Sequence, residues 1–353
     1  MTSILQPPAI ELLSLNDDLV SENVVTCLHS GCQLQHNPTA FEQGLSVVIC
    51  TYKRANNVIQ FLDSLRDHES HPQQLIIVDA SPDDKTEQAI NGYKKVDQLA
   101  DCFIYFRVAG KFKGLTRQRN FSLRWVVTDL TLFFDDDVIL QPQCLQEMER
   151  VYRTQPYKIV GVGAVITNEL IASPDRLWRI RRMLNIVSTL QPGRYCRSGM
   201  SIPWSFLQPT EAVVSVEWLR GAAMMWQTDI LREVGFYSGF EGYAQGEDLD
   251  ISLQMSKFGK LVQVGSAHIL HQHEESGRPD HFKLGYMAIY NRYQIHRRGL
   301  VDRTGRDVVW FIYAWLVDTF FLLRHLIFPS RWQSTILHIA GRIKATYQLL
   351  KGQ

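Results

Sequence analysis

Three adjacent carboxylates, Asp135, Asp136 and Asp137, follow the apolar run 130–134 in the segment FFDDDV. Because side chains alternate along a strand, Asp135 and Asp137 are expected to point to one side and Asp136 to the other. A hard divalent cation such as Mg²⁺ or Mn²⁺ offsets the repulsion between such carboxylates. These ions commonly bind one or two protein carboxylates together with substrate phosphates. The stretch predicts a metal site for a phosphorylated substrate, and the simpler interpretation is a solvated acidic turn.

A second acidic pair, Glu247 and Asp248, stands at the start of the helix predicted over 246–259. The dipole at the start of a helix favours negative charge, so the pair can be structural. One of the two carboxylates can instead act as a general base that removes a proton from an attacking hydroxyl. Both interpretations remain open from these residues alone.

Basic and imidazole side chains could complete such a site. Arg117 and Arg119 stand at the start of a predicted helix, where a diphosphate can bind. The strand predicted over 260–273 ends in three histidines, His268, His271 and His273. A histidine cluster at a strand end, downstream of two acidic sites, favours a role in the same site.

The elements that must position these residues alternate between strand and helix up to residue 137. Predicted strands cover 45–52, 74–81, 102–108 and 130–137, and predicted helices cover 56–68, 85–96 and 115–127. This order indicates an α/β domain with a twisted parallel sheet covered by helices. Ligands of such sheets bind beyond the carboxyl ends of the strands. Thr51, Arg54, Asp79 and the three aspartates are therefore expected to face one crevice.

Composition excludes some classes of protein. The 353 residues are 45% hydrophobic, and 37 Lys and Arg balance 36 Asp and Glu, so no nucleic-acid partner is expected. No basic region followed by an apolar core opens the chain, so no cleaved secretion signal is expected. The six scattered cysteines are interpreted as reduced thiols of a cytoplasmic protein.

Taken in order, several segments resemble the family 2 glycosyltransferases. They are VVICTYKR, LIIVDASPD, GLTRQRN, FFDDDV, WLRGAAMMWQTDILREVGFYSGF, GEDLDISLQMSKFG and HILHQH, within roughly residues 45–275. The resemblance implies a GT-A fold, with a mixed, mostly parallel sheet flanked by helices over 44–275. Residues 1–43 are then an N-terminal extension and 276–353 a C-terminal helical region.

The resemblance also implies a metal-dependent hexosyltransferase. It would move a sugar, with inversion, from a nucleotide-diphosphate sugar to a hydroxyl of a saccharide or lipid-linked acceptor, in polysaccharide or glycoconjugate synthesis. The implied donor-binding residues are Thr51, Arg54, Asp79, Arg119, Asp135, Gly221, Ala222 and Glu247; Asp137 and His271 would bind Mg²⁺ or Mn²⁺, and Asp248 would be the catalytic base. Gln118 departs from the alanine usual before the family's arginine, and which of the three histidines binds the metal stays open.

Two rival functions are weighed against this one. A nucleotidyltransferase should have a glycine-rich basic loop after its first strand, whereas CTYKRANN contains no glycine. A non-catalytic protein that binds sugar nucleotides could lack Asp248, which is present here. Inversion requires a base on the face opposite the leaving group, and Asp137 and Asp248 come from different elements.

The apolar segment 308–328 is long enough to cross a bilayer. Asp318 lies at its middle, where a charge costs ~3 kcal/mol on insertion scales, and Arg324 and His325 add to that cost. Three alternatives remain open: a helix packed on the enzyme or on a second subunit of a homodimer, a peripheral membrane helix within 300–330, and a spanning helix. The expected location is the cytoplasm, with the inner face of the cell membrane as the alternative.

Overall fold

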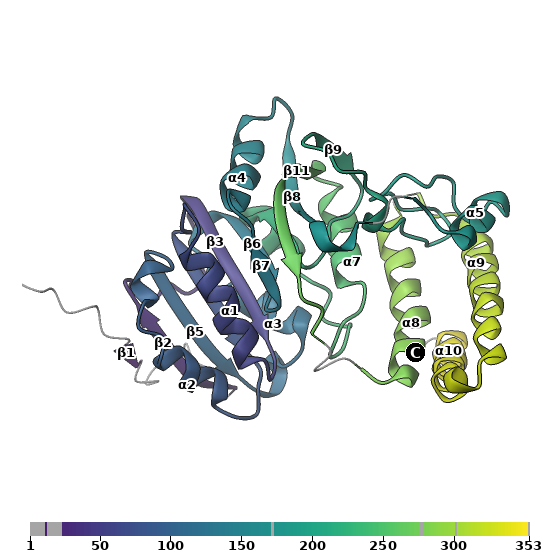
Figure 1. Ribbon diagram of the computed structural model, residues 1–353, viewed down its shortest axis with the longest axis horizontal. Coiled ribbons are helices and arrows are strands. Elements are labelled where there is room, and N and C mark those ends of the chain that lie inside the picture. The colour runs from purple at the N-terminus through teal and green to yellow at the C-terminus, as the bar shows by residue number, and fades with distance from the viewer. Residues whose placement is uncertain (1–10, 13–22, 171–172, 275–278, 301, 352–353) are drawn as a thin grey trace, which may run out of the picture.

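The computed structural model describes residues 11–12, 23–170, 173–274, 279–300 and 302–351. Within these residues eleven strands form one mixed sheet, in the order β1-β2-β5-β4-β3-β6-β10-β8-β11-β7, with β9 paired to β11 (Figure 1). The strands are β1 (Glu11–Leu12), β2 (Val24–Ser30), β3 (Glu42–Thr51), β4 (Gln74–Asp79), β5 (Cys102–Val108), β6 (Thr128–Asp135), β7 (Val138–Leu140), β8 (Ile159–Ile166), β9 (Val213–Val216), β10 (Ala223–Gln227) and β11 (Lys260–His271).

Helices cover the sheet and form the C-terminal part of the chain. They are α1 (Ala55–Arg66), α2 (Lys85–Asn91), α3 (Leu115–Ser122), α4 (Cys144–Thr154), α5 (Arg176–Met183), α6 (Thr228–Val234), α7 (Glu247–Met255), α8 (His281–Gly299), α9 (Gly305–Leu323) and α10 (Trp332–Leu350). Short 3₁₀ turns include η3 (Thr167–Glu169), η5 (Arg324–Ile327) and η6 (Pro329–Arg331). The predicted alternation of strands and helices is confirmed over residues 42–135.

The four strands β5, β4, β3 and β6 are parallel and form the centre of the sheet. Their side chains alternate between two cores: Val47 and Ile49 pack with Phe61 of α1, whereas Val48 packs with Phe121 of α3. Burial on both faces explains why these strands read as continuous apolar runs. The register pairs Thr51 with Asp79, so the polar ends of neighbouring strands reach one edge of the sheet.

Antiparallel strands extend this parallel centre on both sides. β10 pairs with β6 and with β8, and its register places Ala223 opposite Phe134. Gly221 and Ala222 therefore arrive beside Asp135, whose backbone N–H donates to Ala222 O at 3.3 Å. On the other side, β2 lies within the predicted N-terminal extension and pairs with β5.

A disulfide joins Cys32 and Cys102, whose Cα atoms lie 5.1 Å apart. The expectation that all six cysteines are reduced is wrong for this pair. Antiparallel pairing of β2 with β5 brings together two cysteines that are 70 residues apart in sequence. The other four, Cys27, Cys50, Cys144 and Cys196, are free thiols. Because disulfides are typical of oxidising compartments, the cysteines no longer support a cytoplasmic location, which stays a prediction.

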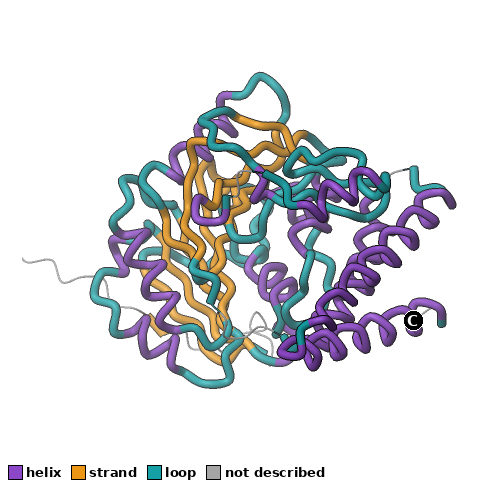
Figure 2. Tube along the Cα trace, turned by 45° about the vertical axis from the view of Figure 1, so that its right-hand side comes forward, coloured by secondary structure: helices purple, strands orange, loops and turns teal. Residues whose placement is uncertain are grey.

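The C-terminal helices gather on the side of the molecule away from β2 and β5 (Figures 1 and 2). α8 and α10 cross closely at two glycines: a Cβ on Gly341 would lie 2.0 Å from Phe282 O, and one on Gly285 would lie 2.0 Å from His338 O. α9 packs on α8 through Phe311, whose ring lies 4.8 Å from that of His296. The predicted helical region is confirmed within the described residues.

Candidate active site

A cavity of about 820 Å³ opens at the carboxyl ends of β3 and β6. It is also lined by the start of α7, the segment before β10 and the end of β11. Most of the site residues predicted from sequence line it: Thr51, Arg54, Asp135, Asp137, Gly221, Ala222, Glu247, Asp248 and His271. Asp79 and Arg119 are not among the lining residues. The predicted crevice at the carboxyl ends of the parallel strands is therefore present, but Asp79 does not face it.

The three aspartates do not continue the alternation of a strand. β6 ends at Asp135, and the chain turns at the next two residues. Asp136 accepts hydrogen bonds from Thr51 Oγ1 at 2.6 Å and from Arg54 Nη1 at 2.9 Å. The expectation that Asp136 points to the side opposite Asp135 and Asp137 is wrong, because the strand ends before Asp136 and all three line the cavity. Asp136 instead holds Thr51 and Arg54 at the cavity wall.

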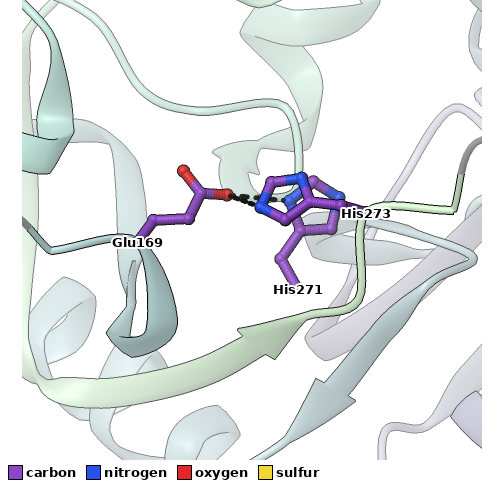
Figure 3. Close-up of side chains that lie close together, drawn as sticks. All are labelled: Glu169, His271 and His273. Carbon is purple, nitrogen blue, oxygen red and sulfur yellow. Dashed lines mark hydrogen bonds and ion pairs between the residues drawn. The ribbon is translucent and has the colours of Figure 1, made fainter.

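His271 ends β11 and lies between two carboxylates. Its Nε2 is 3.1 Å from Asp137 Oδ1, and its Nδ1 is 3.0 Å from Glu169 Oε1. His273 Nε2 lies 2.9 Å from the same Glu169 oxygen, and both rings face that carboxylate (Figure 3). Burial lowers the pKa of His271, but its hydrogen bonds to Asp137 and Glu169 outweigh burial and raise the pKa to about 9. Of the three histidines, His271 is the one that reaches Asp137.

Three of these side chains fit a divalent metal ion. The ligand atoms of Asp135, Asp137 and His271 all lie within 4.8 Å of one another. Carboxylate oxygens suit Mg²⁺ and Mn²⁺, and an imidazole nitrogen is an ordinary ligand of transition metals. Glu169 at Nδ1 would fix the ring so that Nε2 is presented to the metal, as carboxylates do for many metal-binding histidines.

Asp248 faces the cavity from the first turn of α7. The helix begins after Gly246, whose φ of +87° is the left-handed region that favours glycine. Asp248 Oδ2 accepts from the backbone N–H of Gly221 at 3.0 Å, and Oδ1 accepts from that of Leu249 at 2.8 Å. Burial raises the pKa of this carboxyl above its ordinary value. Two backbone donors thus fix the orientation of a carboxylate that is more basic than a solvated one.

Glu247 and Arg119 form an ion pair beneath the cavity. Arg119 is 1% exposed, and its Nη1 lies 2.5 Å from Glu247 Oε1. Its Nη2 lies 3.4 Å from Asp135 Oδ1, and the guanidinium packs against the rings of Phe133 and Phe236. Burial raises the pKa of Glu247 to about 8, although Arg119 opposes this shift. The structure therefore places Arg119 below Glu247 and Asp135, where it supports them, and not at the surface expected of a diphosphate ligand.

Asp79 is also buried below the cavity surface. It accepts hydrogen bonds from the Ser81 backbone N–H at 2.8 Å and from the Tyr105 hydroxyl at 2.9 Å. Its neighbour Ala80 lines the cavity. In this arrangement Asp79 holds the loop that follows β4, and contact with a nucleotide stays a prediction.

The model of the family described as "Glycosyl transferase family 2" matches residues 46–219. Residues 46–219 form a family 2 glycosyltransferase domain. The matched segment runs from within β3 to the residues after β9 and hence contains the three aspartates, Arg119 and Glu169. No curated protein sequence matches the chain significantly.

Solved structures with a similar fold include two transferases. One is the mannosyltransferase PcManGT from Pyrobaculum calidifontis in complex with GDP-Man and Mn²⁺; it is 14% identical, has a TM-score of 0.51, and the match covers 90% of this chain and 81% of that one. The other is GalNAc-T7 with UDP, GalNAc and Mn²⁺, at 13% identity and a TM-score of 0.51, with 71% of this chain and 49% of that one covered. At these identities the likeness supports the GT-A fold alone.

Two residues of the glycosyltransferase site have contacts that the sequence patterns did not predict. Glu169 comes from η3, directly after β8, and pairs with Arg220 as well as with the two histidines. In the sequence, the one sign of a role for Glu169 is its position directly after a buried strand. Gln118, the departure from the family's alanine, donates to Thr51 O at 3.0 Å and to Val78 O at 2.8 Å. Gln118, which also lines the cavity, thereby joins the ends of β3 and β4.

Proposed function

We propose that this glycosyltransferase transfers a sugar from a nucleotide-diphosphate sugar to an acceptor hydroxyl, with inversion at the anomeric carbon. The observation that carries the proposal is that Asp248 and the group Asp135, Asp137 and His271 line one cavity from different elements. Inversion by direct displacement needs a base on the face opposite the leaving diphosphate. A base on α7, separate from a metal group at the ends of β6 and β11 and in the turn after β6, suits that requirement.

The metal proposed for the site is Mn²⁺ in preference to Mg²⁺. Two of the three ligands are carboxylates, and the third is the imidazole of His271. Mg²⁺ prefers oxygen ligands, whereas transition metals accept nitrogen readily. When bound, the cation would stabilise the negative charge that builds up on the leaving diphosphate.

The protein's own residues have separate roles in this proposal. Asp248 accepts the proton of the attacking hydroxyl, while the backbone N–H groups of Gly221 and Leu249 hold its carboxylate in place. Arg54 lines the cavity and is held by Asp136, so its positive charge is fixed near the metal group. A fixed guanidinium suits recognition of a diphosphate.

Donor, acceptor and location belong to the same proposal. The nucleotides bound by the two similar structures make UDP and GDP the first to test. The acceptor proposed is a saccharide or lipid-linked hydroxyl, in polysaccharide or glycoconjugate synthesis on the cytoplasmic face of a membrane.

The test begins with thermal unfolding of the full chain in the presence of UDP-, GDP- and dTDP-sugars, with Mn²⁺ or with a chelator. One donor should raise the melting temperature in Mn²⁺ and not in chelator. Release of the nucleoside diphosphate from that donor, followed by NMR of the product, then reports the anomeric configuration. Retention of configuration, or stabilisation that is equal with chelator, would contradict the proposal.

A further inference from the structure

α9 exposes a continuous apolar stripe. Val309, Ile312, Leu316, Phe320 and Leu323 follow one another at spacings of three and four residues and are all exposed, Phe320 at 69%. Residues at this spacing share one face of a helix. The stripe is unlike the opposite face of α9, where Ala314 and Phe311 are buried.

Exposed apolar side chains also follow α9 in the connection to α10. Ile327 is 76% exposed, and Phe328 and Trp332 are also exposed. Trp332 Nε1 donates to Leu326 O at 2.7 Å, which ties the start of α10 to this connection. These residues and the stripe are together called the C-terminal surface: Val309, Ile312, Leu316, Phe320, Leu323, Ile327, Phe328 and Trp332. Soluble monomers rarely expose apolar patches of this extent without a partner.

The charges on this part of the chain have one sign. Among the exposed charged side chains of residues 302–351, Asp302 is the one acid, and the basic ones are Arg306, Arg324, Arg331, Lys344 and Lys351. No aspartate or glutamate occurs from residue 319 to the end of the sequence. An apolar face bordered by basic side chains is complementary to a bilayer that contains anionic lipids.

Asp318, the residue that weighed against membrane contact in the sequence, does not lie on this surface. Its carboxylate pairs with Arg181 Nε at 3.0 Å and with Arg292 Nη1 at 2.9 Å. Arg181 belongs to α5 and Arg292 to α8, so the charge faces the protein. The cost of placing Asp318 in lipid therefore does not arise when only the outer face of α9 meets the membrane.

The packing of α9 also argues against the spanning arrangement. Within the described part of the chain one segment, Gly305–Ile327, is long and apolar enough to cross a membrane. However, its inner face packs on α8 and on the buried residues Ile186 and Ile202, so lipid could not surround it. α10 then returns to the start of α8 at the glycine crossing. α8, α9 and α10 form one packed unit that exposes the stripe of α9, and α10 also exposes Ile336, Ile343 and Leu350.

We propose that the C-terminal surface docks the enzyme on an anionic lipid bilayer, with α9 lying in the plane of the interface. The aromatic side chains of Phe328 and Trp332 suit the boundary between headgroups and acyl chains. A second copy of the chain is a poorer occupant, because a symmetric dimer through this face would bring basic side chains of the two copies near one another. The proposal is independent of the donor and of the chemistry in the cavity.

Co-sedimentation of the full chain with vesicles tests the proposal. One set of vesicles contains phosphatidylcholine alone, and the other contains phosphatidylcholine with phosphatidylglycerol. We expect binding to the mixed vesicles that weakens as salt is added. Phe320→Glu and Ile327→Glu should each lower vesicle affinity about tenfold or more, given the apolar area removed from the contact. Phe258→Glu, at an exposed phenylalanine that follows α7, is the matched control and should bind as the wild type does.

Charge variants test independently whether basic side chains contribute to vesicle binding. Arg324→Gln with Arg331→Gln should lower affinity for the mixed vesicles and leave the melting temperature unchanged, because both side chains are exposed. Circular dichroism melting of every variant shows whether it is folded. The proposal is overturned if the folded wild type binds neither vesicle, or if binding ignores phosphatidylglycerol. It is also overturned if the wild type is a dimer that Phe320→Glu converts to a monomer while vesicle binding is unchanged.

Discussion

The cavity and the C-terminal surface depart from the usual distribution of side chains in opposite directions. The cavity region buries charged groups, among them Asp137, Glu247 and Arg119, whereas the C-terminal surface exposes large apolar ones such as Phe320 and Ile327. Charges are rarely buried unless they are paired, and apolar patches are rarely exposed without a partner. Both departures cost stability in the isolated chain. For each region we propose a binding partner, a charged ligand in one case and lipid in the other.

The two regions also differ in how the chain builds them. The cavity collects residues from β3, β6, β11 and α7, so its geometry depends on the whole sheet. The C-terminal surface comes from one continuous stretch, α9 and the connection to α10. Substitutions at the cavity should change chemistry and leave vesicle binding intact, and those at the surface should do the reverse.

The largest effect is expected from Asp248→Asn. Loss of a general base should lower turnover by about 10²–10⁴-fold, and affinity for the donor should change little. Release of nucleoside diphosphate measures turnover, and calorimetry measures affinity for the donor. Asp250→Asn is the matched control, because Asp250 lies on the same helix but pairs with Arg298 instead of lining the cavity. Turnover of Asp248→Asn close to the wild-type value would remove Asp248 from the chemistry.

Arg119→Leu should lower the free energy of unfolding by about 3–5 kcal/mol, because it leaves Glu247 buried without its cation. Arg150→Leu, at a side chain that is 56% exposed and paired with Glu147, should change it by about 0–1 kcal/mol. Urea unfolding measures both values. Equal effects for the two variants would show that the ion pair beneath the cavity does not support it.

Glu169→Gln should weaken Mn²⁺ binding about 10–100-fold, because the amide no longer fixes the ring of His271. Mn²⁺ affinity is measured by electron paramagnetic resonance without donor. Glu147→Gln on α4 is the control, since Glu147 is not among the cavity residues. Unchanged Mn²⁺ affinity in Glu169→Gln would show that Glu169 does not orient His271 for the metal.

The smallest effect concerns pH. Burial raises the pKa of Asp248 above its ordinary value of 3.8, and the base acts in its deprotonated form. Activity should therefore be lost, as pH falls, at a higher pH than a solvated aspartate would give. The profile of kcat/KM at saturating Mn²⁺ measures this acid limb. If the pH of this acid limb shifts with Mn²⁺ concentration, the titrating group is a metal ligand and not Asp248.

Sequence patterns predicted the parallel centre of the sheet because its strands are short apolar runs between helices of clear periodicity. The same topology predicted that Thr51, Asp135 and Asp137 meet at one edge. Asp136 was misplaced because a single residue decides where a strand ends and a turn begins. The depth of Arg119 could not be predicted, because burial of an arginine depends on partners such as Glu247, far away in the sequence.

Other features depend on tertiary contacts that leave no local signal. The bond between Cys32 and Cys102 requires the pairing of β2 with β5. Glu169 becomes part of the site only because β8 and β11 are parallel neighbours. In contrast, the inward direction of Asp318 was available from helical spacing, since it lies two residues from Leu316 and so on the other side of α9.

Calorimetric titration of the full chain with UDP and GDP, in Mn²⁺ and in chelator, tests most directly that one cavity holds both the metal group and the base. The wild type and Asp248→Asn should bind one of the two nucleotides in Mn²⁺ with similar affinity, and both should lose that binding in chelator. Asp137→Ala should fail to bind in either condition while remaining folded. Binding by Asp137→Ala that equals the wild type in Mn²⁺ would contradict the account.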